Sequence, residues 1–560
     1  MFTNAQVPQS LRALNYVPNE CYSLSVLHLD SMAKNFELQA LDKDHVLNAF
    51  YKKSKFVKTL MKSWINKDDK LGVDFTAAMA YCDANIIMLP LNNEAKFEKM
   101  LNSLAKQKIP FESMKIGGKA VRYCAYEETG LSVHLFCTSD MAFAFLYVEN
   151  YNVEVLPVKD MAKQRCDELF QSGFLQSPEG KYFVENHMSS YVYYSPESPN
   201  TKQFFNVAAK LGVSDYKDAL RQMNIKTFTR GEVRKNTMTS VMEIFEGEEQ
   251  MAPILIEEDR LNSKQLEKLL PYAGPAPLAI MTCNVQGIGD MMSPVMSAFP
   301  SFQPMASFVN NSFLVRYNAD NVLFVTMLDE SQAVLGSLEL YVQESNRIKD
   351  STYHAAKEMY EKYLSQSEDE EFMESEELKE MNYYALMGMM YAAASGDSLS
   401  GRKSLLHEEK DGWNVYTILT SRLDYEDKEV YVESEEEADE ALEEALELEP
   451  IIVYDTTAYV LVHDGFLFCT NTSEAFKDIR KPSGKPQTLP VEEMLNRPVY
   501  ASADVATLAS LSGIRIDVPI SDLVIYLEGN TVVTNLNAVR GLKHGMFYEM
   551  VKIVADLVNE

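Results

Sequence analysis

A strand-and-helix pattern occurs twice in this 560-residue sequence, and a fragment of it recurs near the C-terminus. The first copy opens at Tyr16–Pro18 and continues through the apolar run Tyr22–Met32. The second opens at Leu270–Tyr272 and continues through Leu278–Ile288, and the fragment is Arg497–Leu511. Each copy has an extended apolar segment that ends at a polar residue before a helix-like pattern. Because the recurrence lacks a strict period, it predicts duplicated domains rather than a solenoid.

The order of strand-like and helix-like patterns predicts an α+β fold, in which duplicated modules of antiparallel sheet have helices packed on one face. We expect a first α+β module over residues 1–160, a middle α+β segment over 161–265 and a second α+β module over 266–560. The middle segment reads equally well as the rest of the first module. In the second module, hairpins are predicted at 312–328 and 458–470, the latter turning at Asp464-Gly465.

Residues 545–558 predict a C-terminal amphipathic helix that docks on the body of the protein and closes the fold. Its apolar face is expected to comprise Phe547, Met550, Val551, Val554 and Val558.

A helical and acidic insertion is predicted at about 352–449. Within it, residues 434–449 form a glutamate-rich helix that begins at the capping box Ser434–Glu437. Because like charges at helical spacing repel, this helix is expected to be marginally stable. Binding of a divalent cation, or of a protein partner that has a basic surface, could order this helix. A role in keeping the protein soluble is the simpler interpretation. Deleting residues 433–449 should therefore leave the melting temperature of the body nearly unchanged.

The formal net charge of −30 argues against binding of nucleic acid or anionic lipid, because both require a basic surface. No stretch approaches the roughly 20 apolar residues of a transmembrane helix. The seven cysteines are scattered and form no CxxC pair, which speaks against a disulfide framework or a zinc site. Five of them lie in apolar runs and are predicted to be buried and unpaired: Cys21, Cys124, Cys137, Cys283 and Cys469.

Short motifs give no catalytic site. Residues Gly396–Leu399 spell GDSL, the string around the nucleophile of a large esterase family, but Ser398 follows a helical pattern without the partner blocks of that family. A helix cap and loop explain the string better. His28, His134 and His463 fall one per strand, which is typical of satisfied edge or core residues. No catalytic, cofactor-binding or metal-binding residue and no cofactor is therefore predicted.

The chain resembles a family of uncharacterised exported lipoproteins found in Bacteroidetes, over most of its length outside the acidic insertion. The residues that carry the resemblance are Tyr16–Pro18, Leu29-Asp30, Gly72–Asp74, Pro90–Asn93, Leu269–Val285 and Asn496–Val505. The resemblance implies a location in the periplasm or at the outer membrane. Members carry a domain of unknown function, so it implies no catalytic residues. The N-terminus shows neither a signal peptide nor a lipobox cysteine, and a cytoplasmic location therefore stays open.

Two hypotheses of function follow from the sequence. The preferred one is a non-enzymatic cell-envelope protein that acts as a binding or scaffold module. The rival is a hydrolase whose site is assembled from residues distant in sequence. A deep pocket with clustered His, Ser or carboxylate side chains would favour the hydrolase.

Overall fold

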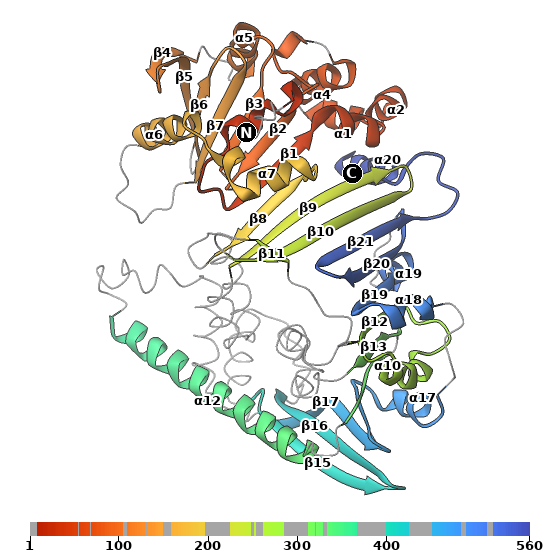
Figure 1. Cartoon of the computed structure of the whole chain (residues 1–560). Coiled ribbons are helices and arrows are strands. Elements are labelled where there is room, and N and C mark those ends of the chain that lie inside the picture. Colours follow the sequence, from red (N-terminus) through yellow and green to blue (C-terminus); the bar gives the residue numbers. More distant parts are fainter. Residues whose placement is uncertain are drawn as a thin grey trace, which may run out of the picture. The chain divides into compact units, whose positions relative to one another are not determined.

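The computed structural model describes residues 8–53, 55–67, 69–83, 85–104, 109–128, 131–148, 158–195, 224–247, 251–253, 261–284, 312–319, 321–328, 333–366, 399–424, 451–482, 489–511 and 519–559 (Figure 1). In these residues the fold is mixed α+β, with helices and antiparallel strands. The chain divides into unit 1, Met1–Leu261 with Asn496–Glu560, and unit 2, Asn262–Leu495.

Unit 1 begins with seven strands whose residues alternate between two buried or half-buried faces. They are β1 (Ser23–His28), β2 (Ala78–Cys82), β3 (Ile86–Pro90), β4 (Glu112–Ile116), β5 (Lys119–Glu128), β6 (Leu131–Cys137) and β7 (Met141–Val148). Their antiparallel pairing gives the order β1-β2-β3-β7-β6-β5-β4. The turn between β4 and β5 is Gly117-Gly118, with φ of 53° and 78°, a conformation that glycine adopts without strain.

The other edge of β1 continues the sheet of unit 1. The additional strands are β8 (Ser190–Tyr194), β9 (Ile225–Arg234), β10 (Thr237–Glu246), β11 (Ala252–Pro253), β19 (Val499–Asp504), β20 (Ile520–Glu528) and β21 (Thr531–Ala538). From β1 the order is β8-β9-β10-β21-β20-β19, and the short β11 pairs with the end of β10.

The described α-helices of unit 1 are α1 (Leu29–Asn35), α2 (Leu38–Lys43), α3 (Asn48–Lys53), α4 (Lys55–Asn66), α5 (Glu94–Leu104), α6 (Val158–Phe170), α7 (Pro178–Glu185), α19 (Val505–Leu511) and α20 (Met546–Asn559).

Two of these helices, α5 and α6, lie against opposite faces of β5–β7. Cys166 of α6 packs in one core cluster with Phe136, whereas Phe97 of α5 packs in another with Leu135. Since adjacent strand residues point to opposite faces, the prediction of helices on one face does not hold for these strands.

The C-terminal helix α20 packs against α2 and α3 in unit 1, and only part of the predicted apolar face, Phe547 and Val551, makes the contact. Tyr548 is buried, whereas Met550 and Val554 are 37% and 48% exposed. The Phe547 ring stacks on Phe36, with centroids 4.7 Å apart, and the Tyr548 hydroxyl donates to Asp44 at 2.8 Å. These two contacts set the rotation of the helix, and the predicted Met550–Val554 stripe therefore faces outward.

The described residues of unit 2 contain seven antiparallel strands. They are β12 (Ala279–Cys283), β13 (Phe313–Tyr317), β14 (Val322–Met327), β15 (Lys403–Lys410), β16 (Trp413–Asp424), β17 (Ile451–His463) and β18 (Phe466–Thr470). Their order is β12-β13-β14-β18-β17-β16-β15. Both predicted hairpins are confirmed, and Asp464 and Gly465 have the positive φ of a two-residue turn, 48° and 76°.

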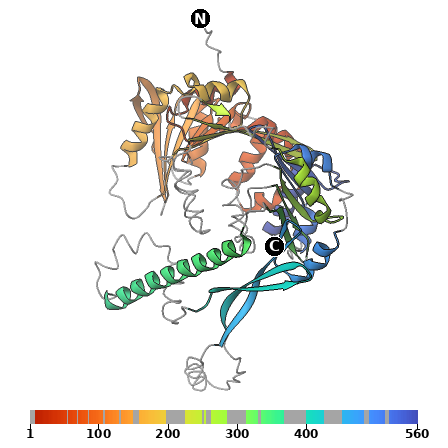
Figure 2. The same ribbon diagram turned by 60° about the horizontal axis from the view of Figure 1, so that its bottom comes forward.

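The helices of unit 2 are α10 (Ser263–Leu269), α12 (Val334–Gln366), α17 (Phe476–Arg480) and α18 (Val491–Asn496), the last of which ends at the unit boundary. Helix α12 lies along β15, where the Asn346 side chain exchanges hydrogen bonds with the Lys403 backbone (Figure 2). It begins at Val334, well before the insertion predicted from about 352. Residues 396–398 of the GDSL string and the acidic helix 434–449 lie outside the described residues.

The five cysteines predicted to be buried are buried and form no disulfide, and the same holds for Cys82 and Cys166. In the part of the chain that the structure describes, no helix is both long enough and apolar enough to cross a membrane.

Candidate functional site

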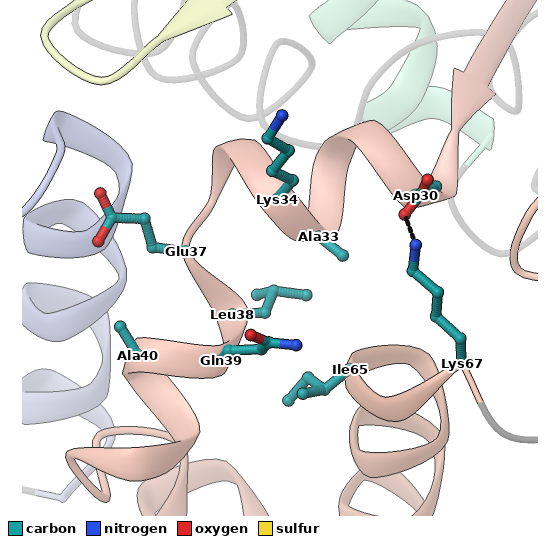
Figure 3. A pocket seen from close by; sticks show the side chains of 9 residues that line it. All are labelled: Asp30, Ala33, Lys34, Glu37, Leu38, Gln39, Ala40, Ile65 and Lys67. Atoms are coloured by element: carbon teal, nitrogen blue, oxygen red, sulfur yellow. Dashed lines mark ion pairs between the residues drawn. The ribbon is translucent and has the colours of Figure 1, made fainter.

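A pocket of about 500 Å³ opens among helices α1, α2 and α4 of unit 1 (Figure 3). We call it the α1–α4 pocket. Its nine lining residues are Asp30, Ala33, Lys34, Glu37, Leu38, Gln39, Ala40, Ile65 and Lys67. They come from two stretches of chain, residues 30–40 of α1, α2 and the turn between them, and residues 65–67 at the end of α4.

The α1–α2 turn is built around Glu37, which precedes α2 in the left-handed conformation with φ of 49°. This conformation is uncommon for a residue other than glycine, so neighbouring contacts must hold it. Its carboxylate accepts hydrogen bonds from the backbone N–H of Gly545 and from Nδ1 of His544, each at 3.2 Å. The start of α20 therefore fixes the corner of the chain that shapes the pocket.

Helix α4 is tied to α1 on the other side. The Trp64 indole N–H donates to the Leu29 carbonyl at 2.7 Å, and the Lys67 ammonium forms an ion pair with Asp30. Trp64 lies in the last turn of α4 and Lys67 directly follows the helix, so the two contacts hold that end beside the start of α1. The pocket thus has a fixed wall on each side.

The floor of the pocket is apolar. Leu38 and Ile65 are buried in a cluster with Leu41, Leu47 and Tyr51. Figure 3 shows Ala33, Leu38 and Ile65 pointing toward the middle of the space. The small Ala33 and Ala40 side chains leave room that larger residues would fill.

The rim of the pocket carries four charges, two acidic and two basic. Asp30 pairs with Lys67, and Glu37 is bound to the start of α20. Among the described residues no ion pair is formed by Lys34, whose side chain is exposed and extends from α1 at the rim (Figure 3). The four charges of the rim therefore sum to zero, and Lys34 is the one charged side chain among them that has no ion-pair or hydrogen-bond partner in the described part of the chain.

His134 lies elsewhere in unit 1, in a buried polar network. Its Nδ1 lies 2.9 Å from the Tyr123 hydroxyl and its Nε2 lies 2.8 Å from the Ser132 hydroxyl, and the side chain is 2% exposed. A neutral imidazole donates from one nitrogen and accepts at the other, so both ring nitrogens have a partner. The prediction that His134 is a satisfied core residue is confirmed.

His463, the last residue of β17, has structural contacts too. Its Nδ1 lies 3.1 Å from the Gly412 carbonyl, and its ring stacks on Trp413 with centroids 4.1 Å apart. Within the described residues, no group of three or more His, Cys, Asp and Glu side chains is placed to hold a metal ion.

Sequence reasoning singled out none of the pocket residues as functional. The available signal was Asp30, the polar residue at which the first apolar strand ends, together with the helical pattern at 47–65. Comparisons of the chain with models of known families, with curated proteins and with solved structures gave no match.

Proposed function

We propose that this protein is a non-enzymatic binding or scaffold protein of the cell envelope, and that the α1–α4 pocket is its binding site. The pocket itself carries this proposal. Its volume of about 500 Å³ falls in the usual range of small-molecule sites, and it combines an apolar floor with a few polar groups. Its nine lining residues include no Ser, Cys, Thr or His, and its two carboxylates are already engaged, Asp30 by Lys67 and Glu37 by His544 and the Gly545 N–H.

A screen of small molecules by thermal shift tests the binding site. Ala33→Trp should fill the pocket and abolish stabilisation by compounds that raise the melting temperature of the wild-type protein. Ser31→Trp is the matched control, because Ser31 is an exposed residue of the same helix and does not line the pocket. Compounds that stabilise wild type and Ala33→Trp equally would show that binding occurs elsewhere.

The envelope location is supported by the resemblance to exported lipoproteins. Fractionation of the native cells tests it, with detection of the endogenous protein by antibody. We expect the protein in the periplasmic or outer-membrane fraction. Recovery in the cytoplasmic fraction alone would refute the envelope location without bearing on the pocket.

We also propose that nucleic acid is not a partner. The net charge of −30 supports this, because binding of nucleic acid requires a basic surface.

One observation favours the rival function, a hydrolase. Ser132, His134 and Tyr123 form the chain of contacts expected of a nucleophile, a base and a group that orients the base. Burial of Ser132 and His134 weighs against it, because a substrate must reach the hydroxyl. We expect no turnover of p-nitrophenyl esters. Turnover that Ser132→Ala abolishes would establish the hydrolase, whereas Ser398→Ala should leave any such activity unchanged.

We also propose that the chain is an internal duplication, in which β1–β10 correspond to β12–β21. The orders β1-β2-β3-β7-β6-β5-β4 and β12-β13-β14-β18-β17-β16-β15 match strand for strand. Short 3-10 helices, η1 (Gln9–Tyr16) and η5 (Leu270–Ala273), precede the first strand of each set. In unit 1, β8-β9-β10 and β21-β20-β19 run in mirrored order from the β10–β21 pair.

Separate expression of residues 1–253 and 261–560 tests the duplication. Each fragment should fold alone with mixed α+β circular dichroism, because each holds one complete set of strands. The fragments should also associate, since β10 and β21 pair from Thr237↔Asn537 to Glu243↔Thr531. A fragment that is unfolded on its own would refute two equivalent modules.

A further inference from the structure

We propose that the α1–α4 pocket takes an amphipathic anion, a molecule with a carboxylate, sulfate or phosphate head and an apolar chain. This inference rests on the proposed function, that the pocket is a binding site. It adds the chemical class of the ligand and assigns Lys34 as the residue that recognises the head.

The contacts of the charged lining residues favour an anion. A cationic head would share Asp30 with Lys67, or Glu37 with His544 and the Gly545 N–H, because both carboxylates are already engaged. An anionic head meets the exposed Lys34 ammonium without breaking either contact. Lys34 has a flexible four-carbon stem and three N–H donors, so its ammonium can follow a head group over the rim.

The floor of the pocket selects an apolar chain. Ala33, Leu38, Ala40 and Ile65 offer no hydrogen-bonding side-chain atom, so a polar ligand body would lose its bonds to water there without replacement. An apolar chain loses none and gains about 25 cal/mol for each Å² removed from water. The Gln39 amide is the one neutral polar group of the lining.

Calorimetric titration of the full chain with three ten-carbon amphiphiles tests the inference, each below its micellar concentration. The probes are decanoate, decanol and decyltrimethylammonium. Decanoate should bind most tightly, and Lys34→Gln should weaken it at least about tenfold, as expected for the loss of one charge-assisted hydrogen bond. Lys43→Gln is the matched control, because Lys43 is exposed on α2 and does not line the pocket. It should change the affinity less than about twofold.

A charge reversal sharpens the test. Lys34→Glu should shift the preference from decanoate to decyltrimethylammonium, whereas a lysine that only stabilises α1 would leave the preference unchanged. Equal affinity of the three probes, or equal affinity of wild type and Lys34→Gln for decanoate, overturns the assignment of an anion. If one of these outcomes is found and Ala33→Trp abolishes binding of the probes, the pocket is still a binding site, but for another class of ligand. Failure of all three probes to bind overturns the amphipathic ligand, and the compound screen then decides the proposed function.

Discussion

The ammonium of Lys226 lies inside unit 1, where only 2% of its side chain is exposed. It binds the Glu179 carboxylate at the start of α7 and lies 5.1 Å from the centre of the Tyr193 ring. Burial by itself raises the pKa of Glu179, but the hydrogen bond and charge of Lys226, with hydrogen bonds from the Glu179 backbone N–H and from Ser177, together lower that pKa below its ordinary 4.5. A buried pair of this kind costs desolvation of both ions, so each depends on the other.

Lys226→Met should therefore lower the free energy of unfolding by about 3 kcal/mol, because it leaves the Glu179 charge without its partner. Lys181→Met is the control, since Lys181 is exposed on the same helix as Glu179 and should change stability by less than about 0.5 kcal/mol. Urea unfolding at neutral pH measures both. Equal effects of the two substitutions would show that the Lys226–Glu179 pair contributes nothing to the free energy of unfolding.

The pH dependence of this pair has a definite sign. Because folding lowers the pKa of Glu179, the pair stabilises the protein above about pH 4.5, and this contribution is lost as the pH falls through the lowered value. The penalty of Lys226→Met should therefore shrink between neutral pH and about pH 4. A penalty that stays constant over this range would contradict the role of the charge.

The cysteines give a second prediction at this scale. Burial raises the pKa of Cys124 and of Cys166 to about 12, and also raises the pKa of Cys469. Since the thiolate is the reactive form, labelling with a thiol reagent at pH 8 should be slow in the native protein. All seven thiols should react once the protein is unfolded without reductant. Fewer than seven would reveal a disulfide, and fast native labelling would contradict the burial.

At the scale of elements, the β16–β17 hairpin shows where the acidic segment is attached. The two strands pair out to Asp424↔Ile451, and residues 425–450 join them. Under the proposed duplication these strands correspond to β5 and β6, which pair out to Glu128↔Leu131 and are joined by residues 129–130 alone. On that proposal, the acidic segment takes the place of a hairpin turn.

Replacing residues 425–450 with the dipeptide Thr-Gly should shift the melting temperature by less than about 2 °C, because the strand pairing is kept. A variant in which a Gly/Ser segment of the same length replaces residues 425–450 is the control for charge. Its melting temperature should also stay close to that of the wild type. A fall of more than about 10 °C in either variant would show that the acidic segment belongs to the core. Calcium titration of the wild type and both variants then tests the proposed cation partner at 434–449.

The docking of α20 also gives a prediction. Tyr548→Ala should destabilise unit 1 by about 3 kcal/mol, because it removes a buried ring and leaves Asp44 without the phenol hydrogen bond. Val554→Ala should cost less than about 0.5 kcal/mol, since Val554 is half exposed. Chemical unfolding distinguishes the two. If Val554→Ala lowers the free energy of unfolding more than Tyr548→Ala does, the helix packs through the Met550–Val554 face predicted from the sequence.

Elements with local signals were predictable from the sequence. The Asn93 side chain accepts from the Lys96 backbone N–H at 2.9 Å and caps α5, and Asp464-Gly465 turns the β17–β18 hairpin. The start of α12 was not predicted, because Leu340 and Ile348 are exposed on that helix and blur its amphipathic pattern. The face of α20 depends on tertiary contacts with Phe36 and Asp44, which no local pattern contains.

At the scale of the whole molecule, the recurrence in the sequence pointed to duplication, but it could not give the strand order. The pairings β3–β7 and β14–β18 each pass over three intervening strands, so they depend on contacts distant in sequence. The pocket was beyond prediction for the same reason. It joins Asp30 to Lys67 and requires the left-handed Glu37, which a helix 507 residues away in sequence stabilises.

Hydrogen–deuterium exchange with mass spectrometry shows directly whether a small ligand binds at the α1–α4 pocket. The full chain is measured with and without saturating decanoate. We predict slower exchange in peptides covering α1, α2 and the end of α4, and unchanged exchange in peptides covering β6, which contains Ser132 and His134. Protection confined to β6 or to unit 2, with none in α1 and α2, would contradict the account.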